Sequence, residues 1–157
     1  MRRFLLLICL LLGLRVEASE LQIGVLPSFQ YRNGFVGLLR TDLTLLFGTD
    51  FFKLGPFAMY EGISPQVTDT SYGAAIRIGN EAYFQLQGGY FQRVFNQTGT
   101  GTLNGKGFSA GLVGGWHVSP HVGVDVVLSA KRIDSGTLTR RWIIDLLPLI
   151  TFRVDLW

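Results

Sequence analysis

The stretch GKGFSAGLVGGWHVSPHVGVDVVLSAKR, residues 105–132, decides the fold of this chain. Apolar side chains recur at every second position along nearly its whole length, which is the period of a β-strand and not of an α-helix. The apolar face includes Leu112 in the first half and Leu128 in the second. Ser119-Pro120 interrupts the alternation as a tight turn would. Each half is about ten residues long, the length at which a tilted strand crosses a bilayer.

The amino-terminal segment predicts a cleaved secretory signal peptide over residues 1–18. Two arginines precede an apolar run at 4–14, and small residues follow it at the positions that signal peptidase requires. This run is too short to be a membrane anchor, because a helix needs about twenty apolar residues to span the bilayer. A lipoprotein anchor at Cys9 is disfavoured because the preceding Ile8 is bulky. Residues 19–157 then form one predicted domain.

The predicted mature chain is nearly neutral. Removing three arginines from the 14 basic residues and Glu17 from the 11 acidic ones leaves 11 against 10. This balance gives no basic patch for nucleic acid. Because Cys9 is the one cysteine of the chain, the mature part has neither a disulfide framework nor a thiolate nucleophile. No cofactor is predicted.

The same alternation recurs along the rest of the chain and predicts eight strands. They are expected at about 21–31, 36–47, 53–61, 71–79, 82–93, 105–118, 122–132 and within 142–157. The face of the third strand is ambiguous, because Phe57 and Met59 compete with Leu54 and Tyr60 for the apolar side. Asn33-Gly34 is a strong hairpin signal.

The joints between these strands alternate in length. Long loops are predicted at 62–70, 94–104 and 133–141, and short turns between them. Short periplasmic turns that alternate with longer outside loops are typical of outer-membrane barrels. The alternation of faces also predicts three-residue loops, which would pair Val118 with Val122 and Ile78 with Ala82.

These observations predict an all-β fold, an eight-stranded antiparallel up-and-down transmembrane β-barrel. Closure is required if the apolar face meets lipid, since an open sheet edge in hydrocarbon leaves backbone groups unpaired. A water-soluble barrel of the lipocalin kind, with its apolar face inside, is the alternative. Lipid is favoured because the charges of the polar face are few and balanced. The lumen is predicted to hold a charge network of Arg40, Asp42, Arg77, Asp125, Arg153 and Asp155.

A further set of residues supports the membrane interpretation. Aromatic residues near strand ends would form interfacial girdles, and these are Phe47, Tyr72, Tyr90, Trp116 and Trp142. Within the network, Asp125 is expected to face Arg77 or Arg153 across the lumen.

The chain resembles small bacterial outer-membrane barrels of the OmpA-transmembrane and OmpX kind in its signal peptide, its eight alternating segments and its aromatic carboxyl terminus, TFRVDLW. A fainter resemblance to the MipA/OmpV family lies in Lys53-Leu54-Gly55-Pro56 with Tyr60. The first resemblance implies an assembly signal at Phe152 and Trp157, read by the barrel-assembly machinery. Trp157 is one position out of phase with the apolar face of the last strand.

A cluster of His117, Ser119, His121 and Asp125 raises the possibility of a hydrolase. Some lipid A deacylases with small barrels use a His-x-Ser pair with a nearby acid. This cluster lies at a short turn, hence on the periplasmic side, whereas such enzymes act on outer-leaflet lipid. We therefore predict no catalytic residue and no metal site, because two histidines without an adjacent carboxylate bind metal weakly.

The sequence thus predicts a non-enzymatic protein of the Gram-negative outer membrane. Its role would be structural, or surface adhesion or ligand binding through the three long loops. A lipid A-modifying enzyme is the alternative, and a narrow pore is the third possibility. The expected partners are outer-membrane lipid, lipopolysaccharide and the assembly machinery, but not nucleic acid, and a monomer is expected. Arg140 and Arg141 at the outer rim could hold lipid phosphate, although two solvated charges are the favoured interpretation.

Overall fold

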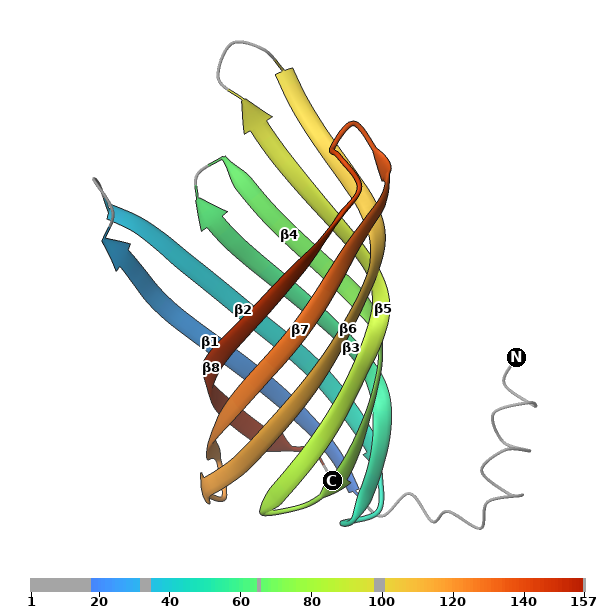
Figure 1. Cartoon of the computed structure of the whole chain (residues 1–157). Helices are drawn as coiled ribbons and strands as arrows, with labels where there is room; N and C mark the ends of the chain where they lie inside the picture. The colour runs from blue at the N-terminus through green and yellow to red at the C-terminus, as the bar shows by residue number, and fades with distance from the viewer. Residues whose placement is uncertain (1–17, 32–34, 65, 98–100, 157) are drawn as a thin grey trace, which may run out of the picture.

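Eight strands close into one barrel in the computed structural model (Figure 1), which describes residues 18–31, 35–64, 66–97 and 101–156. Strands adjacent in sequence pair antiparallel, and β1 pairs with β8 to complete the ring. The strands are β1 Ala18–Tyr31, β2 Phe35–Gly48, β3 Phe52–Ser64, β4 Val67–Gly79, β5 Ala82–Gln97, β6 Gly101–Ser119, β7 Val122–Gly136 and β8 Arg141–Asp155. The predicted up-and-down barrel is confirmed.

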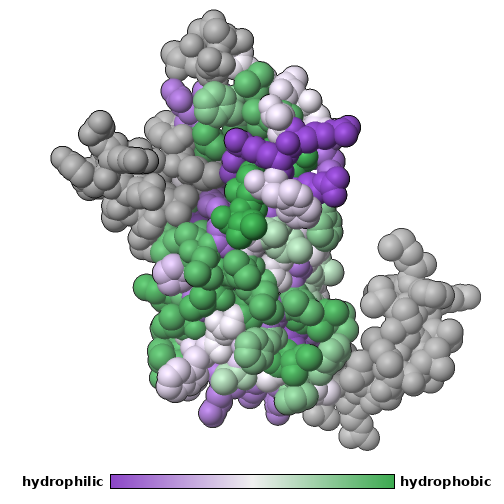
Figure 2. Space-filling model, in the orientation of Figure 1, coloured by the Kyte–Doolittle hydropathy of each residue, from purple (hydrophilic) through white to green (hydrophobic). Residues whose placement is uncertain are grey.

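The outer surface of the barrel is apolar and its interior is largely polar, as the alternation predicts. The outward apolar side chains include Leu43, Leu54, Ile76, Leu86, Leu112, Val126, Leu128, Leu146 and Phe152. Figure 2 shows apolar residues covering the lower part of one face of the barrel. The ambiguity in β3 is resolved: Leu54 and Tyr60 are exposed, whereas Phe57 and Met59 are buried inside. No helix in the described part of the chain is long and apolar enough to span a membrane.

The register fixes the tilt of the strands. Following paired residues around the sheet from Leu146 of β8, through each preceding strand, leads to Ser19 of β1. The Ser19 carbonyl accepts a hydrogen bond from the amide of Leu156, which follows the last residue of β8 and lies ten residues after Leu146 in the chain. A stagger of this kind requires strongly tilted strands, and eight such strands leave an interior that side chains can fill.

The two ends of the barrel differ in their connections. The end that carries the turns at 49–51, 80–81 and 120–121 is called the turn end, and the opposite one the loop end. The structure corrects the three long loops, because strand pairing continues into each predicted loop. Pairs such as Asp69–Arg93 lie inside the barrel, so their polarity reflects the lumen and not a solvated loop.

Two predicted hairpin pairings are also corrected. Ile78 pairs with Phe84 and not with Ala82, so the face is right but the register is two residues away. At the β6–β7 turn, Ser119 pairs with Val122, and the register shifts by one residue between His117 and Ser119. This bulge places one extra residue in β6, which is why Val118 still faces outward although only two residues form the turn. Asn33-Gly34 lies outside the described residues.

Candidate functional site

The lumen holds two groups of charged side chains, one near each end. The turn-end cluster comprises Glu20, Gln22, Lys53, Arg77, Tyr83, Gln85, Asp125 and Arg153. The loop-end cluster comprises Arg40, Asp42, Glu61, Asp69, Arg93, Lys131 and Asp145. All are buried except Arg153 and Asp145, which are partly exposed. Because buried charges are costly unless they are paired and hydrogen-bonded, the pairing in each cluster decides whether the lumen is stable.

Glu20 is the centre of the turn-end cluster. Its two carboxylate oxygens accept from different cations, Lys53 Nζ at 2.6 Å and Arg77 Nη1 at 2.6 Å. Arg153 Nε lies 3.6 Å away. One carboxylate of β1 therefore joins cations from β3, β4 and β8 across the interior.

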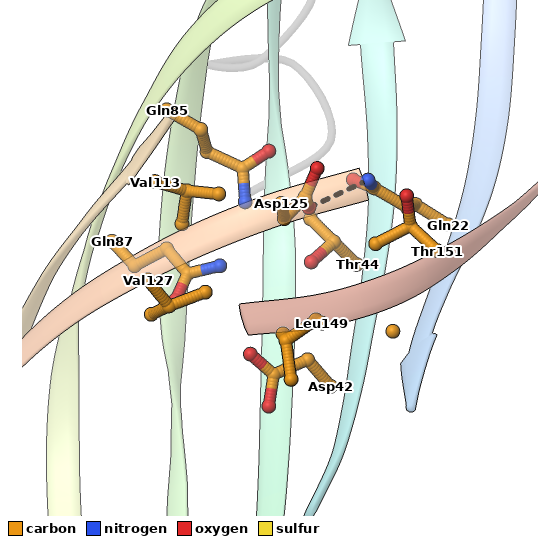
Figure 3. Close-up of a pocket in the computed structure, with 11 residues that line it drawn as sticks. Gln22, Asp42, Thr44, Gln85, Gln87, Val113, Asp125, Val127, Leu149 and Thr151 are labelled. Atoms are coloured by element: carbon orange, nitrogen blue, oxygen red, sulfur yellow. Dashed lines mark hydrogen bonds between the residues drawn. The ribbon is translucent and has the colours of Figure 1, made fainter. Parts of the chain in front are cut away.

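Amide and phenol groups extend this cluster toward the middle of the barrel. Arg77 donates to Gln22 and to Gln85, and its guanidinium lies 4.0 Å from the centre of the Tyr83 ring. Asp125 accepts from Gln22 at 3.1 Å and from the Tyr83 hydroxyl at 2.5 Å. Figure 3 shows Gln22 and Asp125 facing one another in this region. The predicted direct contact of Asp125 with an arginine is thus replaced by neutral donors.

Lys131 is the centre of the loop-end cluster. Its ammonium group contacts three carboxylates, Glu61, Asp69 at 3.1 Å and Asp145 at 3.0 Å. Lys131 also lies 5.9 Å from the centre of the Phe91 ring. One cation of β7 therefore joins acids from β3, β4 and β8.

Two arginines complete the loop-end cluster. Arg40 binds Asp42 through two hydrogen bonds of 2.9 and 3.0 Å and lies 3.9 Å from Glu61. Arg93 binds Asp69 through two hydrogen bonds of 2.6 and 2.7 Å. Such two-point pairs fix geometry as well as charge.

Two groups of buried apolar side chains also lie in the lumen. One group consists of Leu46, Phe57, Met59 and Ala75, and the other of Tyr83, Val113, Val127 and Leu149. A cavity of about 10 Å³ lies beside each group, and Figure 3 shows the residues around the cavity beside the second group. A volume of this size holds roughly one water molecule.

The remaining predicted network residues lie at the turn end. Arg153 binds Asp155 at 2.7 Å and donates to Asn80 at 3.2 Å. Asp155 is half exposed, so its predicted place inside the lumen is corrected: it lies at the last position of β8, where the barrel interior meets solvent.

The predicted aromatic girdle residues lie at two levels. Phe47 and Trp116 lie close to the short turns, whereas Tyr72, Tyr90 and Trp142 lie farther toward the loop end. The rings of Tyr72 and Tyr90 are 5.3 Å apart on neighbouring strands. Of the predicted assembly signal, Phe152 faces outward on β8. Trp157 lies outside the described residues.

The candidate hydrolase residues make separate contacts. Ser119 Oγ accepts from the Val122 amide at 3.1 Å and so caps the turn. His117 lies against the Tyr83 ring at 5.1 Å, and Asp125 is engaged by Gln22 and Tyr83. In the described part of the chain, no hydrogen bond joins the His117 ring to Ser119 or to Asp125. The described residues also contain no group of three metal-ligating side chains.

Comparisons with known proteins give a likeness in structure but none in sequence. No protein-family model matches the chain, and no curated protein matches it. Among solved structures it is similar to Ail, the attachment invasion locus protein of Yersinia pestis, determined in complex with the heparin analogue sucrose octasulfate. That likeness has 12% identity and a TM-score of 0.47, and covers 87% of this chain and 98% of that one. The register of the chain itself shows a closed, eight-stranded antiparallel up-and-down barrel.

Proposed function

We propose that this chain is a non-enzymatic protein of the bacterial outer membrane, with a structural, adhesive or ligand-binding role at its loop end. The observation that carries the proposal is the inversion of polarity. Apolar side chains face outward around the barrel, whereas ion pairs fill the lumen. This is the arrangement that hydrocarbon requires, since a closed barrel pairs backbone groups between neighbouring strands and keeps its charges away from lipid.

Export and insertion belong to the same proposal. The segment 1–18 would direct export and then be removed, and the assembly machinery would insert residues 19–157 as a monomer. The described β1 begins at Ala18. Residues 1–17 and Trp157 lie outside the described residues, so the signal peptide and the terminal aromatic signal stay predictions.

Electrophoresis without boiling tests the membrane barrel. A folded barrel stays compact in detergent and should migrate differently from the same sample after boiling. The membrane fraction of the producing cell supplies the sample, and a soluble protein of equal mass serves as the control. Identical mobility before and after boiling would contradict the proposal.

A conducting pore is disfavoured by the packing of the lumen. Ion pairs occupy both ends, buried apolar side chains also fill the lumen, and the cavities beside those apolar side chains have room for about one water each. Planar-bilayer recordings should therefore show no steady conductance. Discrete conductance steps would favour the pore. Unchanged lipid A in cells with and without the protein would remove the enzyme alternative.

A further inference from the structure

The contact between the first and last strands covers only part of their length. β1 pairs with β2 from Ala18 to Tyr31, but with β8 only from Glu20 to Val25. In the described residues, β1 beyond Val25 and β8 before Ile150 pair on one side alone. Figure 1 shows these upper parts of β1 and β8 diverging. The gap between them is called the β1–β8 notch.

The hydrogen-bond pattern identifies the residues whose backbone faces this notch. Leu156 donates its amide hydrogen to the Ser19 carbonyl at 2.9 Å. In an antiparallel ladder every second residue repeats this arrangement. Odd-numbered residues of β1 therefore direct their backbone groups toward even-numbered residues of β8.

Two prolines, Pro27 and Pro148, lie where the next hydrogen-bonded pair of the β1–β8 ladder would fall. The last recorded bonded pair is Val25 with Ile150, and the same register would next place Pro27 opposite Pro148. Neither proline has an amide hydrogen, so neither can donate across the seam. Each keeps its other ladder, Pro27 with Leu39 and Pro148 with Val126. Because proline occurs in sheets at such edges, the sequence itself ends the β1–β8 ladder at this point.

Outward side chains of β8 are more exposed in the part of the strand that has no β1 neighbour. Outward side chains in its paired part are about half covered: Ile150 is 48% and Phe152 45% exposed. Beyond the prolines, Ile144 is 71% and Leu146 66% exposed. The notch is therefore bordered by apolar side chains that are more exposed than those in the paired part of β8.

The inner side of the notch is lined by apolar side chains of the lumen. Leu26 and Leu149 would be the first unpaired positions on its two sides. Leu149 belongs to the buried group with Val113 and Val127, and Leu26 packs against that group. Because Leu149 is only 2% exposed, these side chains close the lumen behind the notch, and an apolar chain in the notch would lie on its outer side.

Exposed arginines lie at the loop end of the same strand. Arg140 and Arg141 precede and begin β8, and within the described residues neither has an ion pair. Arg132 on β7 lies 5.5 Å from the centre of the Trp142 ring but is paired with Asp134 at 2.7 Å. Figure 2 shows hydrophilic residues grouped near the upper end of the barrel.

We propose that the β1–β8 notch binds an anionic lipid, with an acyl chain along the outward Ile144 and Leu146 of β8 and the phosphate at Arg140 and Arg141. The proposal rests on the membrane location proposed above. Water can reach the unpaired backbone groups from the loop end, where the strands diverge, whereas the bare Ile144 and Leu146 require an apolar neighbour. Paired guanidinium groups suit a phosphate.

Disulfide trapping tests whether the notch exists. Cys9, in the predicted signal peptide, is the one native cysteine. In the predicted mature chain a disulfide can therefore form only between introduced cysteines. Ile23→Cys with Phe152→Cys lies within the ladder and should cross-link in membranes. The pair Phe29→Cys with Leu146→Cys continues the same register across the notch. It should not cross-link, because a disulfide needs Cα atoms within about 7 Å of each other. Adding Pro27→Val and Pro148→Val should allow this second pair to form. Equal cross-linking of both pairs in the chain with native prolines would overturn the notch.

Lipid retention tests the ligand. The barrel would be reconstituted in vesicles of phosphatidylcholine with a minor share of phosphatidylglycerol, and retained lipid counted by native mass spectrometry. Arg140→Gln with Arg141→Gln should lower phosphatidylglycerol retention roughly tenfold or more. Pro27→Val with Pro148→Val should lower it too, whereas Lys106→Gln, at an exposed lysine of β6, should not.

The outcomes separate this proposal from the one on which it rests. Loss of retention in the arginine variant without loss in the proline variant would mean a rim site for phosphate and would overturn the notch as the site. Equal retention in all variants would overturn lipid binding. If the chain is not a membrane barrel, it will fail to insert and will show no shift on boiling, whereas the notch can fail in a barrel that shows that shift.

Discussion

The two lumen clusters are built with opposite charges at their centres. At the turn end a carboxylate, Glu20, contacts three cations, whereas at the loop end a cation, Lys131, contacts three carboxylates. Both centres join partners from β3, β4 and β8. The same strands are thus connected twice, once near each end, by pairs of reversed sign.

The clusters differ in how far the other residues can replace the central ion. Within the described residues Glu20 is the counter-ion of Lys53, and the other partners of Arg77 are neutral amides. At the loop end Arg93 still binds Asp69, and Arg40 lies near Glu61, without any help from Lys131. The turn-end cluster therefore depends on one residue, and the loop-end cluster shares its charges among several.

Replacing Glu20 should cause the largest loss of stability. Glu20→Gln leaves the buried Lys53 and Arg77 without a carboxylate, and breaking such a pair costs about 3 to 5 kcal/mol. Urea unfolding in vesicles, followed by the mobility shift on boiling, measures the change. Glu20→Gln combined with Lys53→Met should recover part of the loss, and a cost no larger than that of a surface substitution would contradict the dependence on Glu20.

Removal of the loop-end centre should cost less. Lys131→Met leaves two arginines beside the buried acids, so we expect a loss of about 2 kcal/mol, typical of a hydrogen bond to a charged group. The same unfolding measurement compares the two centres directly. If Lys131→Met and Glu20→Gln destabilise equally, the clusters do not differ in the way described.

A glycine next to the turn-end cluster allows a steric test. A Cβ at Gly115 would lie 2.3 Å from both Asp125 Oδ1 and Tyr83 Cζ, so Gly115→Ala should displace the phenol from the carboxylate. Overpacking of this kind costs about 1 to 3 kcal/mol. Gly114→Ala is the matched control, because its Cβ would meet Phe84 at 3.8 Å, an ordinary contact. Equal unfolding midpoints for the two variants would show that Tyr83 does not need this space.

The smallest effect is expected outside the barrel. Arg132 and Asp134 form an ion pair at 2.7 Å, but both side chains are about half exposed. Exposed pairs contribute less than about 1 kcal/mol, so Arg132→Gln should leave the unfolding midpoint nearly unchanged. A loss of stability comparable to that caused by Lys131→Met would show that burial does not explain the difference between the exposed and the buried ion pairs.

The fold could be predicted because one face of each strand meets a uniform environment. Alternation in segments such as 105–132 is a property of the sequence alone, and it gave the number of strands and their outward faces. The strand ends could not be predicted, because residues such as Asp69 and Arg93 have the composition of a loop yet lie in paired strands. Because residues that face the lumen are polar, the end of a strand and the start of a loop have similar amino-acid compositions.

Much less of the lumen network could be predicted. Arg40 with Asp42 and Arg77 were recognised by their inward positions, and the structure buries all three. Glu20 was missed because it precedes the apolar alternation and stands next to the expected cleavage site. Contacts such as Lys131 with Asp69 join residues far apart in sequence, and alternation gives the face of a residue but not its neighbour across the barrel.

The place of Glu20 at the start of β1 bears on the order in which the barrel assembles. Arg153 comes from the last strand and Lys53 and Arg77 from the middle of the chain, so their common carboxylate is in position only when β1 meets β8. A sheet that had not closed would hold these cations near hydrocarbon without their acid, at high cost. Partly closed barrels should therefore be scarce, and insertion should proceed in one cooperative step once the first and last strands pair.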